Sequence, residues 1–217
     1  MLPCWWFTLC WSLTGWTMLV LEQGDVNLDS SDKDCQTPLS YTAEHRCKDI
    51  VKMVQEQRDI NSDSSEDKRW TPLFYAAKSG HEGIVKILLE RRDVNLDSSD
   101  RDRRTPQSYA AESEHGSIVK ILLELGNVNS DSSDKAGRTP LSYAAGSGHQ
   151  GIVKILLERE DADPNSSDRS GRTPPDYAGL RGRTGVLRLL SNSSLFSHQT
   201  SQTSSLISGV SGHAPGA

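Results

Sequence analysis

The side chains best suited to hold a metal ion recur along the chain. Residues 25–29 and 93–97 both read Asp-x-Asn-x-Asp, the spacing that begins a calcium-binding EF-hand loop. That loop also needs glycine at its sixth position and glutamate at its twelfth. The second copy has Ser98 and Arg104 there, and the first copy lacks both required residues too. We therefore interpret these segments as acidic, solvated loops.

Three histidines, His81, His115 and His149, recur at intervals of 34 residues. If the repeated segments stack as packed helices, equivalent side chains lie about 10 Å apart, too far to share one metal ion. The chain has no glycine-rich phosphate loop, no Gly-x-Ser-x-Gly nucleophile and no His-Glu-x-x-His helix. We predict a protein with no catalytic, cofactor-binding or metal-binding residues, and therefore not an enzyme.

The cysteines all lie in the first quarter of the chain, and no two of them form a Cys-x-x-Cys pair. A disulfide framework made from them would leave residues 48–217 without a bridge. Free thiols in a reducing compartment fit this distribution better, which favours a cytoplasmic protein. The four cysteines are Cys4, Cys10, Cys35 and Cys47.

A regular period of 34 residues indicates the elements that position these side chains. Thr-Pro occurs five times with that spacing, and a tyrosine follows four residues after every threonine. Residues 71–100 and 139–168 are identical at 22 of 30 positions, so the period is an internal repeat. The Thr-Pro pairs begin at Thr37, Thr71, Thr105, Thr139 and Thr173.

Each repeat predicts two short helices and a polar connection. In the fourth Thr-Pro unit, Thr139 caps a helix, and Pro140 takes the first helical position, where a missing N–H costs nothing. Gly148 ends that helix, and residues 151–158 form a second one. Its apolar stripe is too wide for an isolated helix, so it must face other helices on both sides. Stacking the repeats buries the surface that one repeat alone leaves exposed.

The segment TPLSYAAGSGHQGIVKILLE resembles an ankyrin repeat, whose T-P-L-H-x-A-A, G-H and V-V-x-L-L-L motifs it follows. Its Ser-Tyr form is similar to repeats that are abundant in fungal ankyrin proteins. The resemblance covers residues 33–190 and implies an all-α repeat solenoid of helix-turn-helix units joined by hairpin loops. It also implies that the recurring histidines bond backbone groups in turns, and that hairpin tips and the exposed face of the first helices bind partners.

The chain departs from the ankyrin pattern at the hairpin tips. The tip glycine is present as Gly137 and Gly171, but Cys35, Arg69 and Arg103 occupy the equivalent positions in the other repeats. Because glycine adopts a tight turn without strain, we expect the first three tips to be looser. The family's histidine three residues after threonine is also replaced, by Ser40, Phe74, Ser108, Ser142 and Asp176.

The period divides the chain into seven segments. Projected back from Thr37, it aligns Phe7 with the recurring tyrosine, so the uncharged segment 1–32 is expected to be a degenerate first repeat. The remaining predicted segments are repeats at 33–66, 67–100, 101–134 and 135–168, a degenerate last repeat at 169–190, and a disordered Ser/Thr-rich tail at 191–217.

Residues 1–21 leave two alternatives open, because they carry no charge and are long enough for a membrane span or a secretory signal. They lack the basic start and the cleavage site of a signal peptide. In a membrane-anchored or secreted protein, Asn165 and Asn192 would be candidate glycosylation acceptors. A third alternative is a sensor fragment of a larger receptor-like protein, in which the apolar first repeat packs on another domain.

Positions that differ between otherwise similar repeats indicate a binding surface, because the stack does not constrain them. They are the four residues before each threonine and those seven and eight after it. We expect a partner there, with Trp70 as an anchor among the tip arginines; solvated tip charges are the alternative. The predicted partner-binding residues are Trp70, Lys68, Arg69, Arg101, Arg103, Arg104, Lys135, Arg138 and Arg172.

The formal net charge of −5 is unevenly distributed along the chain. Residues 1–66 carry 5 basic and 11 acidic side chains, whereas residues 169–190 carry five arginines against Asp176. The acidic balance gives no general attraction to nucleic acid. We expect a monomeric, cytoplasmic scaffold that binds another protein with an acidic or mixed-charge surface.

Overall fold

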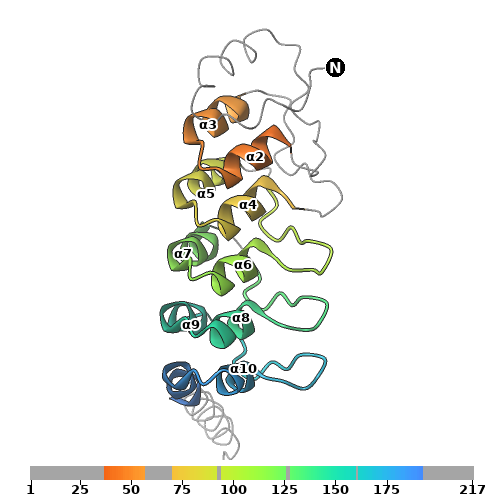
Figure 1. The fold of residues 1–217 in the computed structure, drawn as a ribbon, viewed down its shortest axis with the longest axis vertical. Helices are drawn as coiled ribbons and strands as arrows, with labels where there is room; N and C mark the ends of the chain where they lie inside the picture. The colour runs from red at the N-terminus through yellow and green to blue at the C-terminus, as the bar shows by residue number, and fades with distance from the viewer. Residues whose placement is uncertain (1–36, 57–69, 92–93, 126–127, 160, 193–217) are drawn as a thin grey trace, which may run out of the picture.

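The structure, a computed structural model, describes residues 37–56, 70–91, 94–125, 128–159 and 161–192. Across these residues, helix pairs stack into a solenoid, and no strand is found there (Figure 1). One column contains the first helices, α2 (Pro38–Glu44), α4 (Pro72–Lys78), α6 (Pro106–Glu112), α8 (Pro140–Ser147) and α10 (Pro174–Leu180). The other contains α3 (Lys48–Glu56), α5 (Glu82–Leu89), α7 (Gly116–Leu125), α9 (Gln150–Leu157) and a helix over residues 184–192.

The Thr-Pro pairs begin the first helices as predicted. In each of the first four, the threonine hydroxyl accepts the backbone N–H three residues later, at 3.2–3.3 Å, and proline occupies the first turn. At Thr173 the arrangement differs, because its backbone N–H and hydroxyl both donate to Asp176, at 2.8 and 2.7 Å. The cap therefore starts every first helix at a defined residue.

The core lies between the two columns of helices. Helix α5 packs against α4 of its own pair and against α3 and α7 on either side, which confirms the expected burial of the second helices. The paired alanines of the first helices, such as Ala144 and Ala145, are fully buried. Their small side chains let neighbouring first helices approach closely, so the stack is continuous.

The recurring histidines join each helix pair to the preceding one. His81 Nε2 donates to the carbonyl oxygen of Glu44 at 2.7 Å. His115 and His149 repeat this contact with the last residues of α4 and α6, at 3.1 and 2.9 Å. The predicted backbone role is confirmed, and the structure adds that the bonded carbonyl belongs to the neighbouring repeat. These side chains stabilise the stack.

The hairpin tip at Arg103 is not looser than the glycine tips, contrary to the expectation from sequence. Arg103 adopts φ 63°, in the left-handed region used by Gly137 (φ 86°) and Gly171 (φ 75°). All three tips are closed by equivalent backbone hydrogen bonds of 2.9–3.0 Å. Surrounding contacts therefore impose on Arg103 a conformation that favours glycine. Cys35 and Arg69 lie outside the described residues.

The predicted ends of the solenoid are covered only in part. The proposed degenerate repeat at 1–32, including the uncharged segment 1–21, lies outside the described residues, as does 193–217. Residues 191 and 192, assigned from sequence to the tail, continue the last helix. Within the described ranges, no helix has both the length and the apolar character that a membrane crossing requires.

Candidate partner-binding surface

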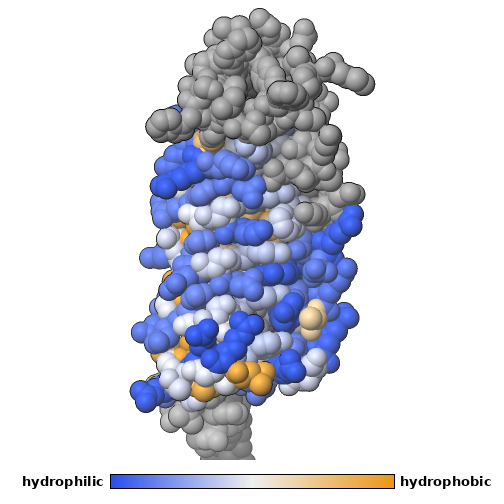
Figure 2. Space-filling model, in the orientation of Figure 1, coloured by the Kyte–Doolittle hydropathy of each residue, from blue (hydrophilic) through white to orange (hydrophobic). Residues whose placement is uncertain are grey.

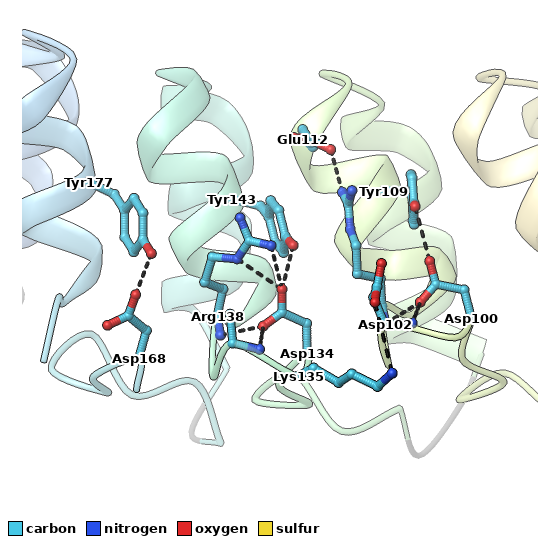
Figure 3. Close-up of polar contacts among 12 residues, drawn as sticks. Asp100, Asp102, Tyr109, Glu112, Asp134, Lys135, Arg138, Tyr143, Asp168 and Tyr177 are labelled. Atoms are coloured by element: carbon cyan, nitrogen blue, oxygen red, sulfur yellow. Dashed lines mark hydrogen bonds and ion pairs between the residues drawn. The ribbon is translucent and has the colours of Figure 1, made fainter. Parts of the chain in front are cut away.

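A tyrosine–aspartate hydrogen bond fixes each of the last three hairpins to its first helix (Figure 3). Tyr143 donates its hydroxyl proton to Asp134 Oδ2 at 2.7 Å. The other carboxylate oxygen accepts two backbone N–H groups of the hairpin, each at 2.8 Å. The pairs Tyr109–Asp100 and Tyr177–Asp168 repeat this arrangement, with O–O distances of 3.1 and 2.5 Å. Buried carboxylates thus hold the hairpins rigidly against the helices.

The ionisation states of one such pair suit this contact. Burial raises the pKa of the Asp134 carboxyl, but hydrogen bonds from Tyr143 and Arg138 outweigh it, so the pKa lies below its ordinary value. Burial is the main reason that the pKa of the Tyr143 hydroxyl is raised, and the hydrogen bond to Asp134 raises it further. At neutral pH the phenol therefore donates to an ionised carboxylate. Burial also raises the pKa of Tyr109, to about 12.

Backbone hydrogen bonds align the three hairpin tips with one another. The N–H of Lys135 donates to the carbonyl oxygen of Asp102 at 2.7 Å, and the N–H of Arg169 donates to that of Ala136 at 2.8 Å. The Lys135 ammonium also lies 4.0 Å from the Asp102 carboxylate. Figure 1 shows these hairpins projecting side by side from the column of first helices. The tips form a continuous edge with a fixed spacing.

Beside the tips, guanidinium groups alternate with tyrosine rings. Arg104 lies 3.6 Å from the ring centroid of Tyr109 and 4.3 Å from that of Tyr143. Its guanidinium also forms an ion pair with Glu112. Arg138 lies 4.8 Å from the Tyr143 centroid and pairs with Asp134 at 2.8 Å. The two arginines therefore have partners within the protein, and the cation–π contacts connect successive repeats.

Trp70 continues this series at the position that arginine occupies in the following repeats. Its ring stacks on Phe74 at 5.0 Å and meets the edges of Tyr75 and Tyr109 at 5.3 and 6.2 Å. The Lys78 ammonium lies 4.4 Å from the indole centroid. Trp70 is half-buried directly before α4, so the side chain contributes to packing as well as to the surface.

The predicted binding residues fall into two groups. Arg101, Arg103, Lys135 and Arg172 are exposed, and each lies in a hairpin or directly after its tip. Trp70, Arg104 and Arg138 are less exposed and pack into the aromatic series; the Arg104 side chain is only 15% exposed. Lys68 and Arg69 lie outside the described residues.

The tyrosine–aspartate pairs were not predicted from sequence, although the sequence contains a signal for them. A carboxylate residue stands nine residues before each recurring tyrosine. The binding positions were predicted from variation between repeats, and these two positions are nearly constant. No group of acidic, histidine and cysteine side chains suited to a metal ion occurs within the described part of the chain. What the arrangement offers chemically is a rigid, positively charged edge.

Comparison with known proteins agrees with the geometry. The family model for ankyrin repeats (three copies) matches residues 15–100, 56–134, 92–168 and 108–201. These overlapping matches span most of the chain. No curated protein matches the sequence.

Proposed function

Because the chain belongs to the ankyrin repeat family, we propose that it binds a partner protein through its hairpin tips and the exposed face of its first helices. Ankyrin repeats are generally protein–protein interaction modules and are typically non-catalytic. We specify which surface of this chain binds and which charge the partner carries. We also propose that the chain acts as a monomeric scaffold in the cytoplasm.

One observation carries the proposal: the threonine and tyrosine that recur in every repeat are buried or bonded inside the stack, whereas the variable residues of the hairpin tips face solvent. Thr139 is buried, and Tyr143 is bonded to its hairpin. By contrast, Arg101 and Lys135 are exposed at tips that are held rigidly. Because backbone hydrogen bonds already fix these hairpins, binding does not have to order the loops, which favours their use in recognition.

The charge of the tips supports an acidic or mixed-charge partner. The hairpin aspartates point inward and bond backbone N–H groups and tyrosine hydroxyls, so their charge is directed away from the edge. Among tip residues 101–103, 135–137 and 169–171, Asp102 is the one acidic side chain, and Lys135 lies beside it. Arg101, Arg103 and Arg169 are exposed and give this edge a positive charge that attracts carboxylates of a partner.

The proposal can be tested by comparing two triple variants of the full chain that lose the same charge. One replaces Arg101, Arg103 and Lys135 by serine at the tips. The other replaces Lys86, Lys120 and Lys154, which are exposed on the second helices, in the same way. We expect proteins captured quantitatively by the wild type to be retained by the second variant and lost from the first. Equal capture by both variants, or equal loss, would contradict the assignment.

A further inference from the structure

In two of the repeats, side chains at a pair of variable positions contact each other within the repeat. One is the residue just before the capping threonine, and the other lies seven residues after that threonine. In the second Thr-Pro unit these are Trp70 and Lys78, whose ammonium lies over the indole at 4.4 Å. In the third they are Arg104 and Glu112, which form an ion pair. In both units, therefore, the charged side chain at one position has its partner at the other.

In the fourth unit, the second position has no side chain to offer. The two positions hold Arg138 and Gly146, and the Arg138 guanidinium pairs with Asp134 of its own hairpin at 2.8 Å. Gly146 is buried, and a Cβ there would lie 3.6 Å from the Tyr177 Cβ of the next repeat. The internal pairing seen in the two preceding units is therefore interrupted here.

In the fifth unit, the two positions hold Arg172 and Leu180. Arg172 is exposed, and no ion pair to its side chain is found among the described residues. The two neighbouring carboxylates are engaged elsewhere: Asp168 accepts the Tyr177 hydroxyl at 2.5 Å, and Asp176 accepts both donors of the helix cap. The guanidinium is therefore available to an external carboxylate.

Leu180 is the apolar element of this site. Its side chain is 68% exposed, and it is the large hydrophobic residue that stands out as exposed in the described chain. The equivalent residues of the preceding repeats are Gly146, Glu112 and Lys78. Arg181 follows it and is also exposed. Figure 2 shows hydrophobic surface gathered over this last repeat beside strongly hydrophilic residues.

The charge of the last repeat distinguishes it from the rest of the chain. Residues 169–190 hold five arginines and one aspartate, a net charge of +4, whereas the whole chain carries −5. A cationic and apolar surface at one end of an acidic protein is complementary to an acidic segment that also presents a large apolar side chain. A single exposed leucine gives little area for insertion into a membrane, which favours a protein partner.

We propose that Arg172, Leu180 and Arg181, which we call the terminal patch, make the strongest contact with the partner. The ligand is a protein segment in which a carboxylate stands next to a leucine-like side chain. Arg172 and Arg181 bind the carboxylate, and Leu180 packs on the apolar side chain. The inference rests on the proposed function, and it places the strongest contact with the partner at the last repeat instead of at Trp70.

The test uses the full chain and a fluorescent peptide of about 15 residues built from Glu-Glu-Leu units, with binding followed by anisotropy. Matched peptides carry glutamine for glutamate, or serine for leucine. We expect Leu180→Ser to weaken binding of the Glu-Glu-Leu peptide roughly tenfold. Changing Arg172 and Arg181 together to glutamine should weaken binding about as much and reduce its salt dependence. All three side chains are exposed, so the variants should keep the wild-type circular dichroism spectrum.

The matched control changes Lys120 and Lys154 to glutamine, because these exposed residues lie on the second helices and give the same change in charge. Its affinity should stay within about twofold of the wild type. Equal binding of the serine peptide, or unchanged binding by both patch variants, would overturn the inference. Tighter, patch-dependent binding to anionic vesicles or single-stranded DNA would also overturn it.

A further variant separates this inference from the proposed function. If changing Arg101 and Arg103 to glutamine abolishes peptide binding while both patch variants bind normally, the terminal patch is wrong and the hairpin edge remains the binding surface. If the patch variants lose binding and the tip variant binds within about threefold of the wild type, the terminal patch is supported.

Discussion

The third and fourth units, residues 100–125 and 134–157, share the same order of hairpin and two helices but differ at positions that favour this structure. The fourth has Gly137 at the hairpin tip, where the left-handed conformation is unstrained. The third has Arg103 in the same conformation and closes its turn with the same hydrogen bonds. Packing of the neighbouring repeats therefore outweighs the preference of arginine for a negative φ.

The difference extends into the core and the turn between the helices. Leu141 of the fourth unit and Gln107 of the third are both buried, at 1% and 0% exposure. Neither amide atom of Gln107 has a hydrogen-bond partner in the described structure. Glu114 also has a positive φ, 66°, where the fourth unit has Gly148. The third unit thus keeps the fold at a cost in stability, and the contacts of its neighbours offset that cost.

The largest expected effect comes from exchanging the two buried residues. Gln107→Leu should raise the free energy of unfolding by about 2 kcal/mol, because it removes an unsatisfied buried amide. Urea unfolding followed by circular dichroism measures this change. The reciprocal variant Leu141→Gln should lower the free energy by about 3 kcal/mol, since it adds the same defect to an otherwise regular repeat. A loss of stability in Gln107→Leu would contradict the expectation that the buried amide is unsatisfied.

The next effect concerns the hairpin carboxylates, which differ between the units. Asp134 binds Tyr143 at 2.7 Å and also pairs with Arg138, whereas Asp100 binds Tyr109 at 3.1 Å. We expect Asp134→Asn to lower the free energy of unfolding by about 2 kcal/mol and Asp100→Asn by about 1 kcal/mol. Equal losses in the two variants would show that the added ion pair contributes nothing.

The pH dependence of stability provides a second measurement on Asp134. Because its pKa is lowered in the folded state, its contribution is present above the unfolded pKa and is lost as pH falls through the folded pKa. Between about pH 5 and about pH 2, stability should therefore decline less steeply in Asp134→Asn than in the wild type. Parallel curves would indicate that other carboxylates cause the acid sensitivity.

The smallest effect is expected at the hairpin tip. Arg103→Gly should stabilise the chain by about 1 kcal/mol, because glycine adopts the left-handed conformation without strain. The shift in thermal midpoint gives the sign of this effect. Gly137→Arg is the reverse substitution, and a Cβ there would lie 3.0 Å from backbone atoms of the next hairpin. That variant should lose more stability than Arg103→Gly gains; similar shifts would mean that the two tips are equally tolerant.

Most of the architecture could be predicted from sequence because the stack depends on short-range signals. The Thr-Pro caps, the paired alanines and the helix-ending Gly148 act within a few residues, and their recurrence at a period of 34 identifies the repeat. The candidate binding positions could also be predicted from sequence, since variation among internal copies marks residues that the stack does not constrain. Exposure of Arg101 and Lys135 agrees with that reasoning.

The roles of individual side chains could not be predicted in the same way. Arg104 and Arg172 occupy equivalent positions, yet the first is covered by Tyr109, Tyr143 and Glu112 while the second is exposed beside Leu180. The residues that decide this difference belong partly to the next repeat. The last described repeat has no such neighbour in the described structure.

The sequence by itself determined the repeat, the residues at which the first helices begin and the positions open to variation, because these depend on caps and periodicity within a unit. Tertiary structure decided which histidine bonds which carbonyl, which carboxylate turns inward to tyrosine, and which arginine remains available for a partner. It also decided that Arg103 adopts a glycine conformation. The physical reason is that these outcomes depend on contacts between residues that come together only when neighbouring repeats pack.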